Sequence, residues 1–275
     1  MFKVDRYAIF SNAKNHRMVV GYPLIIPTAN IHHLSLIDSQ RHTSRLSKSL
    51  LVCNTNCALV GVAVPLFALQ KALGPVSDVS VVTMQAISGA GYPGVPSMDI
   101  LDNVVPFISG EEEKIEQEAR KVLAEKPVKF DGLEEGEKVS HYEESKIRIS
   151  SQCNRVPVLD GHTACISLRF ANREKIPSAA SCRTAMAEYV SAVQDLGCAS
   201  APPQAIVVMD EDDRPQPRLD RDVGNGQSVC VGRVRGDPSG IWDILFVSLA
   251  HNTVIGAAGA SILNAEAAVK QGYIT

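Results

Sequence analysis

The sequence predicts an α+β fold, in which a mixed β-sheet carries helices on one face and follows the last strands of a parallel α/β sheet. Three observations support this prediction. Strand-like apolar runs alternate with helical spacings along most of the chain. No glycine-rich strand-turn-helix of the dinucleotide-binding kind precedes residue 57. With 45% hydrophobic residues among 275, the chain can fill the core of one large domain or two smaller ones.

The charge balance and the cysteine content argue against several classes of function. A formal net charge of -3 gives no reason to expect a nucleic acid or an anionic membrane as partner. No apolar run reaches the roughly 18 residues that a spanning helix needs, and the first residues lack the apolar segment of a signal peptide. Seven cysteines without C-x-x-C pairs favour reduced thiols over disulfides or a metal site. We therefore expect a cytoplasmic protein without a bound metal.

The N-terminal part of the chain contains two short apolar runs, residues 7–10 and 22–27, with a polar loop at residues 11–18 between them. These runs are typical of the last strands of an α/β sheet. Arg17 lies in the polar loop, where an arginine is most often a solvated surface residue.

Residues 50–66 organise the rest of the chain. They read as an apolar strand, an Asn/Thr turn, and a cysteine where an apolar helical run begins. Asn and Thr cap helices well, so Cys57 should lie in the first turn of a helix. The positive end of the helix dipole would lower the pKa of a thiol there and favour a nucleophile. The alternative is a buried structural cysteine, because free cysteine is among the most buried residue types.

The middle of the chain continues with alternating elements. Helical spacing runs to Leu73 and ends at Gly74-Pro75, and a strand over residues 76–84 then delivers Gln85. The Gly/Pro-rich loop at 88–96 would let the backbone approach a ligand closely. Acidic residues at 111–113 suit the first turn of a helix. Residues 120–145, rich in Lys and Glu, predict an exposed surface excursion.

Asp160-Gly161 lies between two β-like runs and predicts a hairpin. Arg155 and His162 would flank its tight turn and point toward one site. A lone histidine near a turn is more often structural, but beside a nucleophilic cysteine it becomes the acid/base candidate.

The last part of the chain has a helical spacing over residues 184–196, strands at 228–234 and 244–250, and a final helix that ends near Gly272.

Taken together, six stretches resemble the aspartate-β-semialdehyde dehydrogenase family in its fungal and archaeal branch. They follow the order of the family from about residue 7 to the end of the chain, which makes the resemblance specific. The stretches are residues 10–18 (FSNAKNHRM), 54–57 (NTNC), 85–94 (QAISGAGYPG), 110–114 (GEEEK), 154–163 (NRVPVLDGHT) and 252–259 (NTVIGAAG).

This resemblance implies an oxidoreductase of amino-acid biosynthesis that interconverts aspartyl phosphate and aspartate semialdehyde with NADP. It implies that Cys57 is the nucleophile that forms a thioester, that His162 is the acid/base, and that Gln85 orients the thioester. An acyl phosphate does require a thiolate, cations for the departing phosphate, and a proton donor.

The resemblance also implies how ligands and subunits are bound. The substrate is a small anion derived from an amino acid, and the protein is a homodimer through the uncovered face of the sheet. The implied substrate-binding residues are Arg155 for the carboxylate, Glu111 for the amine, Lys114 and Arg17 for the phosphate, and Asn56. The implied cofactor-binding residues are Asn252, Ser88 and Gly89.

The sequence departs from the family at its N-terminal side, where relatives carry a dinucleotide-binding half with a Gly-rich phosphate loop. We therefore expect a remnant of that half at residues 1–50, a catalytic and dimerisation domain at 51–250, and a C-terminal helix at 251–275 that returns to the cofactor side. Losing contacts to the adenosine and diphosphate would weaken NADP binding by about a thousandfold or more, so NADP binding by this chain is doubtful.

Two alternatives remain open at this point. A repurposed paralogue would use Cys57 and His162 for non-redox cyclisation, isomerisation or addition chemistry. A non-catalytic paralogue would only dimerise with a relative.

Overall fold

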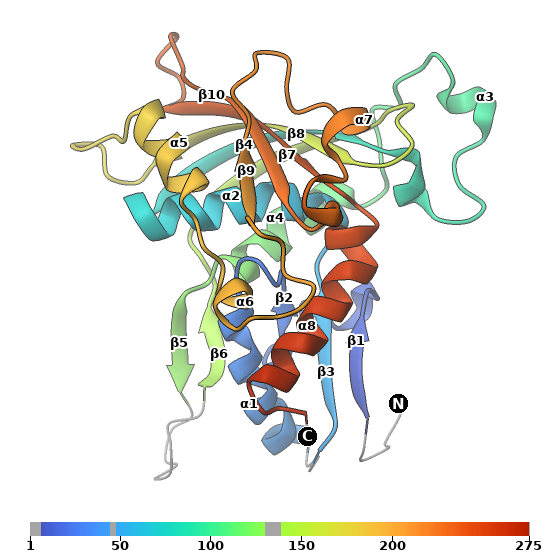
Figure 1. The fold of residues 1–275 in the computed structure, drawn as a ribbon, viewed down its shortest axis with the longest axis vertical. Coiled ribbons are helices and arrows are strands. Elements are labelled where there is room, and N and C mark those ends of the chain that lie inside the picture. Colours follow the sequence, from blue (N-terminus) through green and yellow to red (C-terminus); the bar gives the residue numbers. More distant parts are fainter. Residues whose placement is uncertain (1–6, 45–47, 130–138, 275) are drawn as a thin grey trace.

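The computed structural model describes residues 7–44, 48–129 and 139–274. Figure 1 shows a large sheet in the upper half, helices beneath it, and a small parallel sheet in the lower half. The predicted combination of a mixed sheet with helices on one face and a short parallel sheet is confirmed.

The large sheet has six strands in the order β7-β4-β8-β11-β10-β9. β4 pairs with β7 in parallel and with β8 in antiparallel fashion, so the sheet is mixed. The strands are β4 (Val76–Gln85), β7 (Arg148–Arg155), β8 (His162–Phe170), β9 (Ile206–Val208), β10 (Val229–Gly236) and β11 (Ile244–Ala250).

The predicted hairpin at Asp160-Gly161 is wrong, because β4 lies between β7 and β8. The connection between the two strands crosses the end of β4 and bonds to the chain that follows it. Ile87 N donates to Val158 O at 2.8 Å, and Val156 N donates to Gln85 O at 3.0 Å. Gly161 does take the positive φ of 98° that favours glycine. The conformational freedom of Gly161 is used, but its N–H donates to the Asn252 side chain and not across a hairpin, and β4 fills the space between β7 and β8.

One face of the sheet is covered by helices α2 (Cys57–Leu73), α4 (Glu111–Val122) and α5 (Ala179–Ala187). Val81 of β4 and Ile166 of β8 are cross-strand partners that are buried on this face against α2. Their neighbours Val82 and Cys165, which are also partners, point to the other face, where Cys165 is exposed. Among the described residues no helix covers that second face.

The helix predicted over residues 184–196 is wrong as a single element. The structure has α5 and then a separate short helix, α6 (Ala192–Asp195). Ser191 interrupts the spacing because it caps α6, and its backbone N–H is held by the Gln194 side chain at 2.9 Å.

The small sheet has the order β1-β3-β2, and both pairs are parallel. Its strands are β1 (Ala8–Ser11), β2 (Leu24–Ile25) and β3 (Leu50–Asn54). Helices α1 (Leu36–Ser44) and α8 (Gly259–Lys270) pack against it, with Ile37 and Leu263 in a shared apolar cluster. The sequence did not predict α1.

Residues 120–145 contain more structure than a surface excursion. Strands β5 (Lys126–Lys129) and β6 (Val139–Glu143) form an antiparallel pair, and the Tyr142 ring stacks on buried His33 at 4.0 Å between centroids.

The remaining short elements connect these units, and none of the helices among the described residues is both long and apolar enough to cross a membrane. They are η1 (Lys14–His16), η2 (Ile31–Ser35), η3 (Ile87–Ala90), α3 (Ser97–Ile100), α7 (Pro217–Asp220), η4 (Val223–Gly226) and the π-helical turn η5 (Val254–Ala258).

Candidate active site

The ends of three neighbouring strands meet the first turn of α2 at one edge of the large sheet. β4 and β7 run in parallel and end at the register pair Gln85 and Arg155. β8 runs the opposite way and begins at His162, next to the pair formed by Met84 and Thr163. The register of the sheet therefore brings together side chains from distant parts of the sequence.

Cys57 is the first residue of α2. Asn56 caps the helix, since its side-chain oxygen accepts a hydrogen bond from Ala58 N at 2.9 Å. The Cys57 side chain is partly exposed. The predicted turn, cap and first-turn cysteine are therefore present.

The resting Cys57 thiol is not acidic. Burial raises its pKa to about 11, and the Glu111 carboxylate acts in the same direction. The guanidinium groups of Arg155 and Arg17 lower the pKa, but they do not compensate. The predicted net lowering of the thiol pKa is therefore wrong, because burial outweighs the groups that lower it, and a helix end contributes only about 0.3–1 kcal/mol.

His162 lies against the thiol, as the sequence predicted, with Nε2 at 3.3 Å from Cys57 Sγ. Ala86 N donates to Nδ1 of the same ring at 3.0 Å. A nitrogen that accepts from a backbone N–H carries no proton, so the neutral ring has its hydrogen on Nε2 and presents it to the sulfur. Burial lowers the pKa of His162 to about 3, with Arg155 and His251 adding to the effect.

Arg155 and His162 share Ala86 as a support. The Arg155 Nη1 donates to Ala86 O at 2.7 Å, while Ala86 N holds the imidazole. Gly89 lies over both side chains, because a Cβ at this position would come within 3.0 Å of Arg155 Nη1 and of the His162 ring. Gln85 is 1% exposed and donates to Thr83 Oγ1 at 3.4 Å.

A network of carboxylates links the nucleophile to the remaining predicted residues. Glu111 Oε1 accepts from Asn56 Nδ2 at 2.7 Å, and its Oε2 lies 3.1 Å from Lys114 Nζ. Glu118 accepts from Asn56 N at 2.6 Å and pairs with Arg17 at 2.9 Å. The predicted residues Arg17, Asn56, Glu111 and Lys114 are therefore linked in one network through Asn56 and the two carboxylates.

Sequence reasoning missed Glu118. A signal was present, because seven residues separate it from Glu111, which places both on the same face of α4. Arg17 is not a solvated surface residue either: it is 8% exposed, and its Nη2 donates to Asn12 O at 2.7 Å.

The predicted cofactor residues Ser88, Gly89 and Asn252 lie beside His162, and we call the segment Ser88–Gly89 the ledge. Asn252 Nδ2 donates to Ser88 Oγ at 2.8 Å, and its oxygen accepts from Gly161 N at 2.8 Å. Asn252 is 2% exposed and both ends of its amide are hydrogen-bonded, whereas Ser88 and Gly89 are exposed. Asn252 therefore positions the ledge, and the exposed backbone of residues 88–89 is the part that can touch a ligand. Across the described ranges no group of three His, Cys, Asp or Glu side chains is arranged to hold a metal ion.

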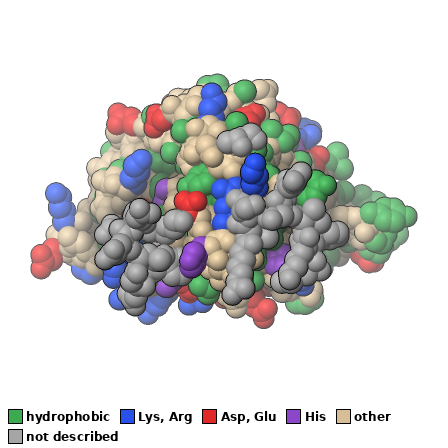
Figure 2. Space-filling view, turned by 90° about the horizontal axis from the view of Figure 1, so that it is seen from below, with side chains coloured by type: hydrophobic (Ala, Val, Ile, Leu, Met, Phe, Trp, Pro, Cys, Tyr) green, Lys and Arg blue, Asp and Glu red, His purple; other side chains and the backbone are tan. Residues whose placement is uncertain are grey.

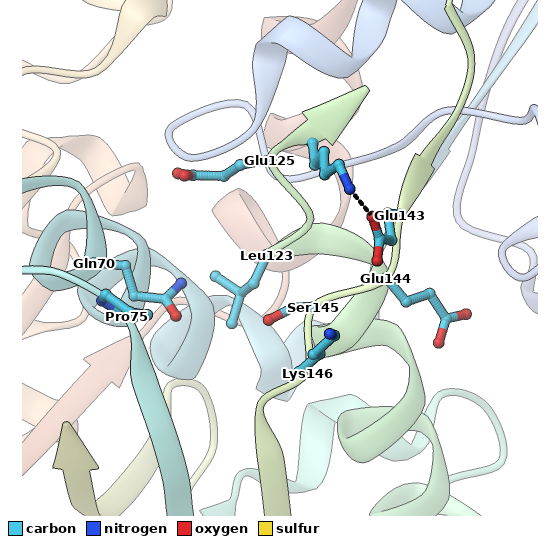
Figure 3. Close-up of a pocket in the computed structure, with 9 residues that line it drawn as sticks. Gln70, Pro75, Leu123, Glu125, Glu143, Glu144, Ser145 and Lys146 are labelled. Carbon is cyan, nitrogen blue, oxygen red and sulfur yellow. Dashed lines mark hydrogen bonds and ion pairs between the residues drawn. The ribbon is translucent and has the colours of Figure 1, made fainter. Parts of the chain in front are cut away.

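A separate pocket, shown in Figure 3, lies at the start of β4, the opposite end from Gln85. Charged side chains surround it, including the pair formed by Lys126 and Glu143 at 2.7 Å. None of the predicted site residues lines it.

Comparisons with known proteins identify relatives of this chain. The family described as "Semialdehyde dehydrogenase, dimerisation domain" matches residues 66–255. An aspartate-semialdehyde dehydrogenase of Trichophyton rubrum is 53% identical over 99% of this chain and 73% of its own length. The protein of that name from Schizosaccharomyces pombe is 54% identical, with the same shares of 99% and 73%. A crystal structure of aspartate semialdehyde dehydrogenase with NADP from Candida albicans is 45% identical and has a TM-score of 0.83, covering 97% of this chain and 72% of that one.

Proposed function

This chain belongs to the aspartate-semialdehyde dehydrogenase family of oxidoreductases, and from that premise we propose that it interconverts aspartyl phosphate and aspartate semialdehyde with NADP, using Cys57 as the nucleophile. The observation that carries the proposal is the 3.3 Å contact between Cys57 Sγ and His162 Nε2 at the start of α2. The 53% identity to a protein of that name supports the same reaction.

In the direction of aspartyl phosphate, the sulfur of Cys57 attacks the acyl carbon, a thioester forms, and inorganic phosphate leaves. The thiol must lose its proton, which leaves with the phosphate as hydrogen phosphate, and the high pKa of Cys57 opposes this loss. The Nε2–H of His162 favours the thiolate by donating to the sulfur, and the guanidinium groups of Arg155 and Arg17 act in the same sense. The same N–H can donate to the oxygen that becomes negative when the carbonyl carbon is attacked.

Charged side chains around Cys57 match the groups of the substrate. Arg155 would bind the substrate carboxylate, and Glu111 would contact its amine. Lys114 and Arg17 would bind the phosphate. Asn56 would fix the position of Glu111 relative to the turn that carries Cys57, because its side chain donates to the Glu111 carboxylate. Gln85, buried at the end of β4, would orient the thioester.

The described residues fit the nicotinamide end of NADP. The exposed backbone of Ser88 and Gly89 lies beside His162, and any side chain at Gly89 would fill the space over the imidazole. Asn252 holds this ledge through Ser88 Oγ. When bound, NADP supplies the hydride acceptor or donor of the reaction. The protein contributes the position of the ledge and the hydrogen-bond donor of His162.

We also propose a homodimer in which the uncovered face of the large sheet meets its equivalent. Cys165, Val82 and Val247 occupy the centre of this face in register. The segment formed by residues 87–108 projects beside the sheet (Figure 1), and exposed apolar side chains gather on this side of the molecule (Figure 2). They are Tyr92, Met98, Leu101, Val104 and Phe107. A cytoplasmic location is part of the proposal, supported by seven cysteines that form no disulfide.

The domain division is proposed as before: a parallel-sheet unit at residues 1–50, a catalytic and dimerisation unit at 51–250, and a C-terminal helix at 251–275. β3 (Leu50–Asn54) belongs to the small sheet and α2 begins at Cys57, so the turn between the two units lies a few residues after the first proposed boundary.

The test is NADP reduction by the purified protein with aspartate semialdehyde and inorganic phosphate. Because contacts to the adenosine and diphosphate are expected to be missing, the assay uses NADP in large excess. Under these conditions we expect turnover that requires phosphate and that Cys57→Ser lowers by at least about a thousandfold. Cys165→Ser is the matched control, because this thiol lies on the uncovered sheet face, and it should retain activity. Turnover that survives Cys57→Ser would refute the nucleophile. Consumption of the semialdehyde without NADP reduction would favour a non-redox enzyme instead.

A further inference from the structure

We propose that Glu118 is a positioning residue whose two carboxylate oxygens fix the phosphate-binding cation Arg17 relative to the turn that carries Cys57. The inference rests on the proposed function, which makes Arg17 a phosphate ligand. Glu118 touches neither Cys57 nor a substrate position by itself; it acts through Arg17 and through the backbone of Asn56.

The geometry uses both oxygens of one buried carboxylate. Glu118 Oε1 accepts from Arg17 Nη1 at 2.9 Å, and Oε2 accepts from Asn56 N at 2.6 Å. Glu118 is 2% exposed, so both bonds are shielded from water. Charge-assisted hydrogen bonds of this kind are about twice as strong as neutral ones and have a defined geometry.

One of these bonds positions the nucleophile turn, and the other positions the proposed phosphate ligand. The Asn56 bond holds the residue immediately before the nucleophile, whose side chain also caps α2. The Arg17 bond holds a guanidinium that reaches the site from the polar loop after β1. Glu118 itself belongs to α4. Three elements that are distant in sequence therefore meet at one side chain.

Arg17 has a hydrogen-bond donor to spare. Its Nη1 is bonded to Glu118 and its Nη2 to Asn12 O, whereas its Nε is buried without a partner among the described residues. A buried N–H without an acceptor is costly, and an oxyanion next to it would satisfy it. Because Glu118 and Asn12 hold the other two nitrogens, the direction of Nε is fixed.

A carboxylate is required at position 118 because both of its contacts come from N–H donors. A glutamine has one oxygen and one NH2, so Glu118→Gln would turn a donor toward either Arg17 or Asn56. Glu113→Gln is the matched control: it makes the same charge change on the same helix, and Glu113 is exposed.

The first experiment measures binding of inorganic phosphate by calorimetry, together with the KM for phosphate and the KM for aspartate semialdehyde. We expect Glu118→Gln to weaken phosphate binding and raise the KM for phosphate by about tenfold or more, since small displacements of a binding group have large effects. The KM for the semialdehyde and all constants of Glu113→Gln should stay within about twofold of the wild type. Unchanged phosphate binding in Glu118→Gln would overturn the proposal, and so would an equal rise in both KM values.

The second experiment places Glu118→Gln in an Arg17→Gln background, which removes both charges of the buried pair and guards against misfolding of the single variant. If Glu118 acts through Arg17, the second substitution should weaken phosphate binding by less than about twofold beyond Arg17→Gln alone. Additive losses would overturn the proposal. Calorimetry needs no turnover, so phosphate binding that depends on Glu118 in a protein without dehydrogenase activity would refute the proposed reaction while supporting the role of Glu118.

Discussion

A backbone amide decides the protonation of the imidazole at the active site. Because Ala86 N donates to His162 Nδ1, a proton on this nitrogen would face another donor at 3.0 Å. We predict that nuclear magnetic resonance of 15N-labelled protein shows His162 at pH 7 as the neutral ring with an unprotonated Nδ1 and a protonated Nε2. The spectrum of His162→Gln assigns the signals. Detection of a doubly protonated ring, or of a proton on Nδ1, between pH 6 and 8 would contradict this tautomer.

His162 also makes the stability of the folded state sensitive to acid. The pKa of His162 falls from 6.5 to about 3 on folding, so the unfolded chain binds more protons between these pH values. Stability is then fully present above about pH 6.5 and is lost as the pH falls toward 3. The expected slope from this group is up to about 1.4 kcal/mol per pH unit. Denaturant unfolding of the wild type and of His162→Gln from pH 7 to 4 checks it. Parallel curves for the two proteins would show that His162 contributes nothing.

At the scale of elements, the loop after β4 sets the geometry of two functional side chains. We predict that Gly89→Ala lowers kcat by about tenfold or more without unfolding the protein, because the new Cβ would come within 3.0 Å of Arg155 and His162. Gly89 is exposed, so the fold should tolerate the methyl group. Ala90→Ser, in the same exposed loop, is the control and should keep its activity. Normal turnover by Gly89→Ala would mean that the loop does not lie over the site during the reaction.

Local patterns predicted the elements that local physics decides. The apolar spacing and the Gly74-Pro75 stop predicted the end of α2 at Leu73, and alternation predicted β4 and its delivery of Gln85. The pairing of strands depends on distant residues, so the turn at Asp160-Gly161 could not reveal that β4 separates its neighbours.

Other features escaped the sequence for related reasons. Helix α1 has few apolar residues, and its Gln40 side chain bonds both the N–H and the C=O of Leu51 on β3. That support is tertiary, so it leaves no trace in the spacing of α1 itself. The Glu111 carboxylate, which raises the pKa of Cys57, and the buried contacts of Glu118 likewise reach the site only once α4 is packed on α2.

At the scale of the whole molecule, the uncovered sheet face is the interface of the proposed dimer. Cys165 lies between Val82 and Val247 at the centre of this face. We predict that the wild type sediments as a dimer. Cys165→Arg should make it a monomer, because one arginine from each copy would then lie in the middle of an apolar contact. Arg148→Gln, at the edge strand of the same sheet, should leave the dimer intact. A dimer that survives Cys165→Arg would exclude this face as the interface.

The position of β4 between β7 and β8 also bears on the order of events during folding. Cys57 and His162 are 105 residues apart in sequence, and their contact needs β4 to be paired on both of its edges. Contacts across such long loops cost more closure entropy and form more slowly than local ones. The Asp160-Gly161 sequence between β7 and β8 favours direct pairing of these two strands. If they paired first, β4 could not insert between them until they separated again. We therefore expect a refolding chain to regain native-like secondary structure before Cys57 and His162 come into contact. Activity should then appear later than the recovery of the far-ultraviolet circular dichroism signal.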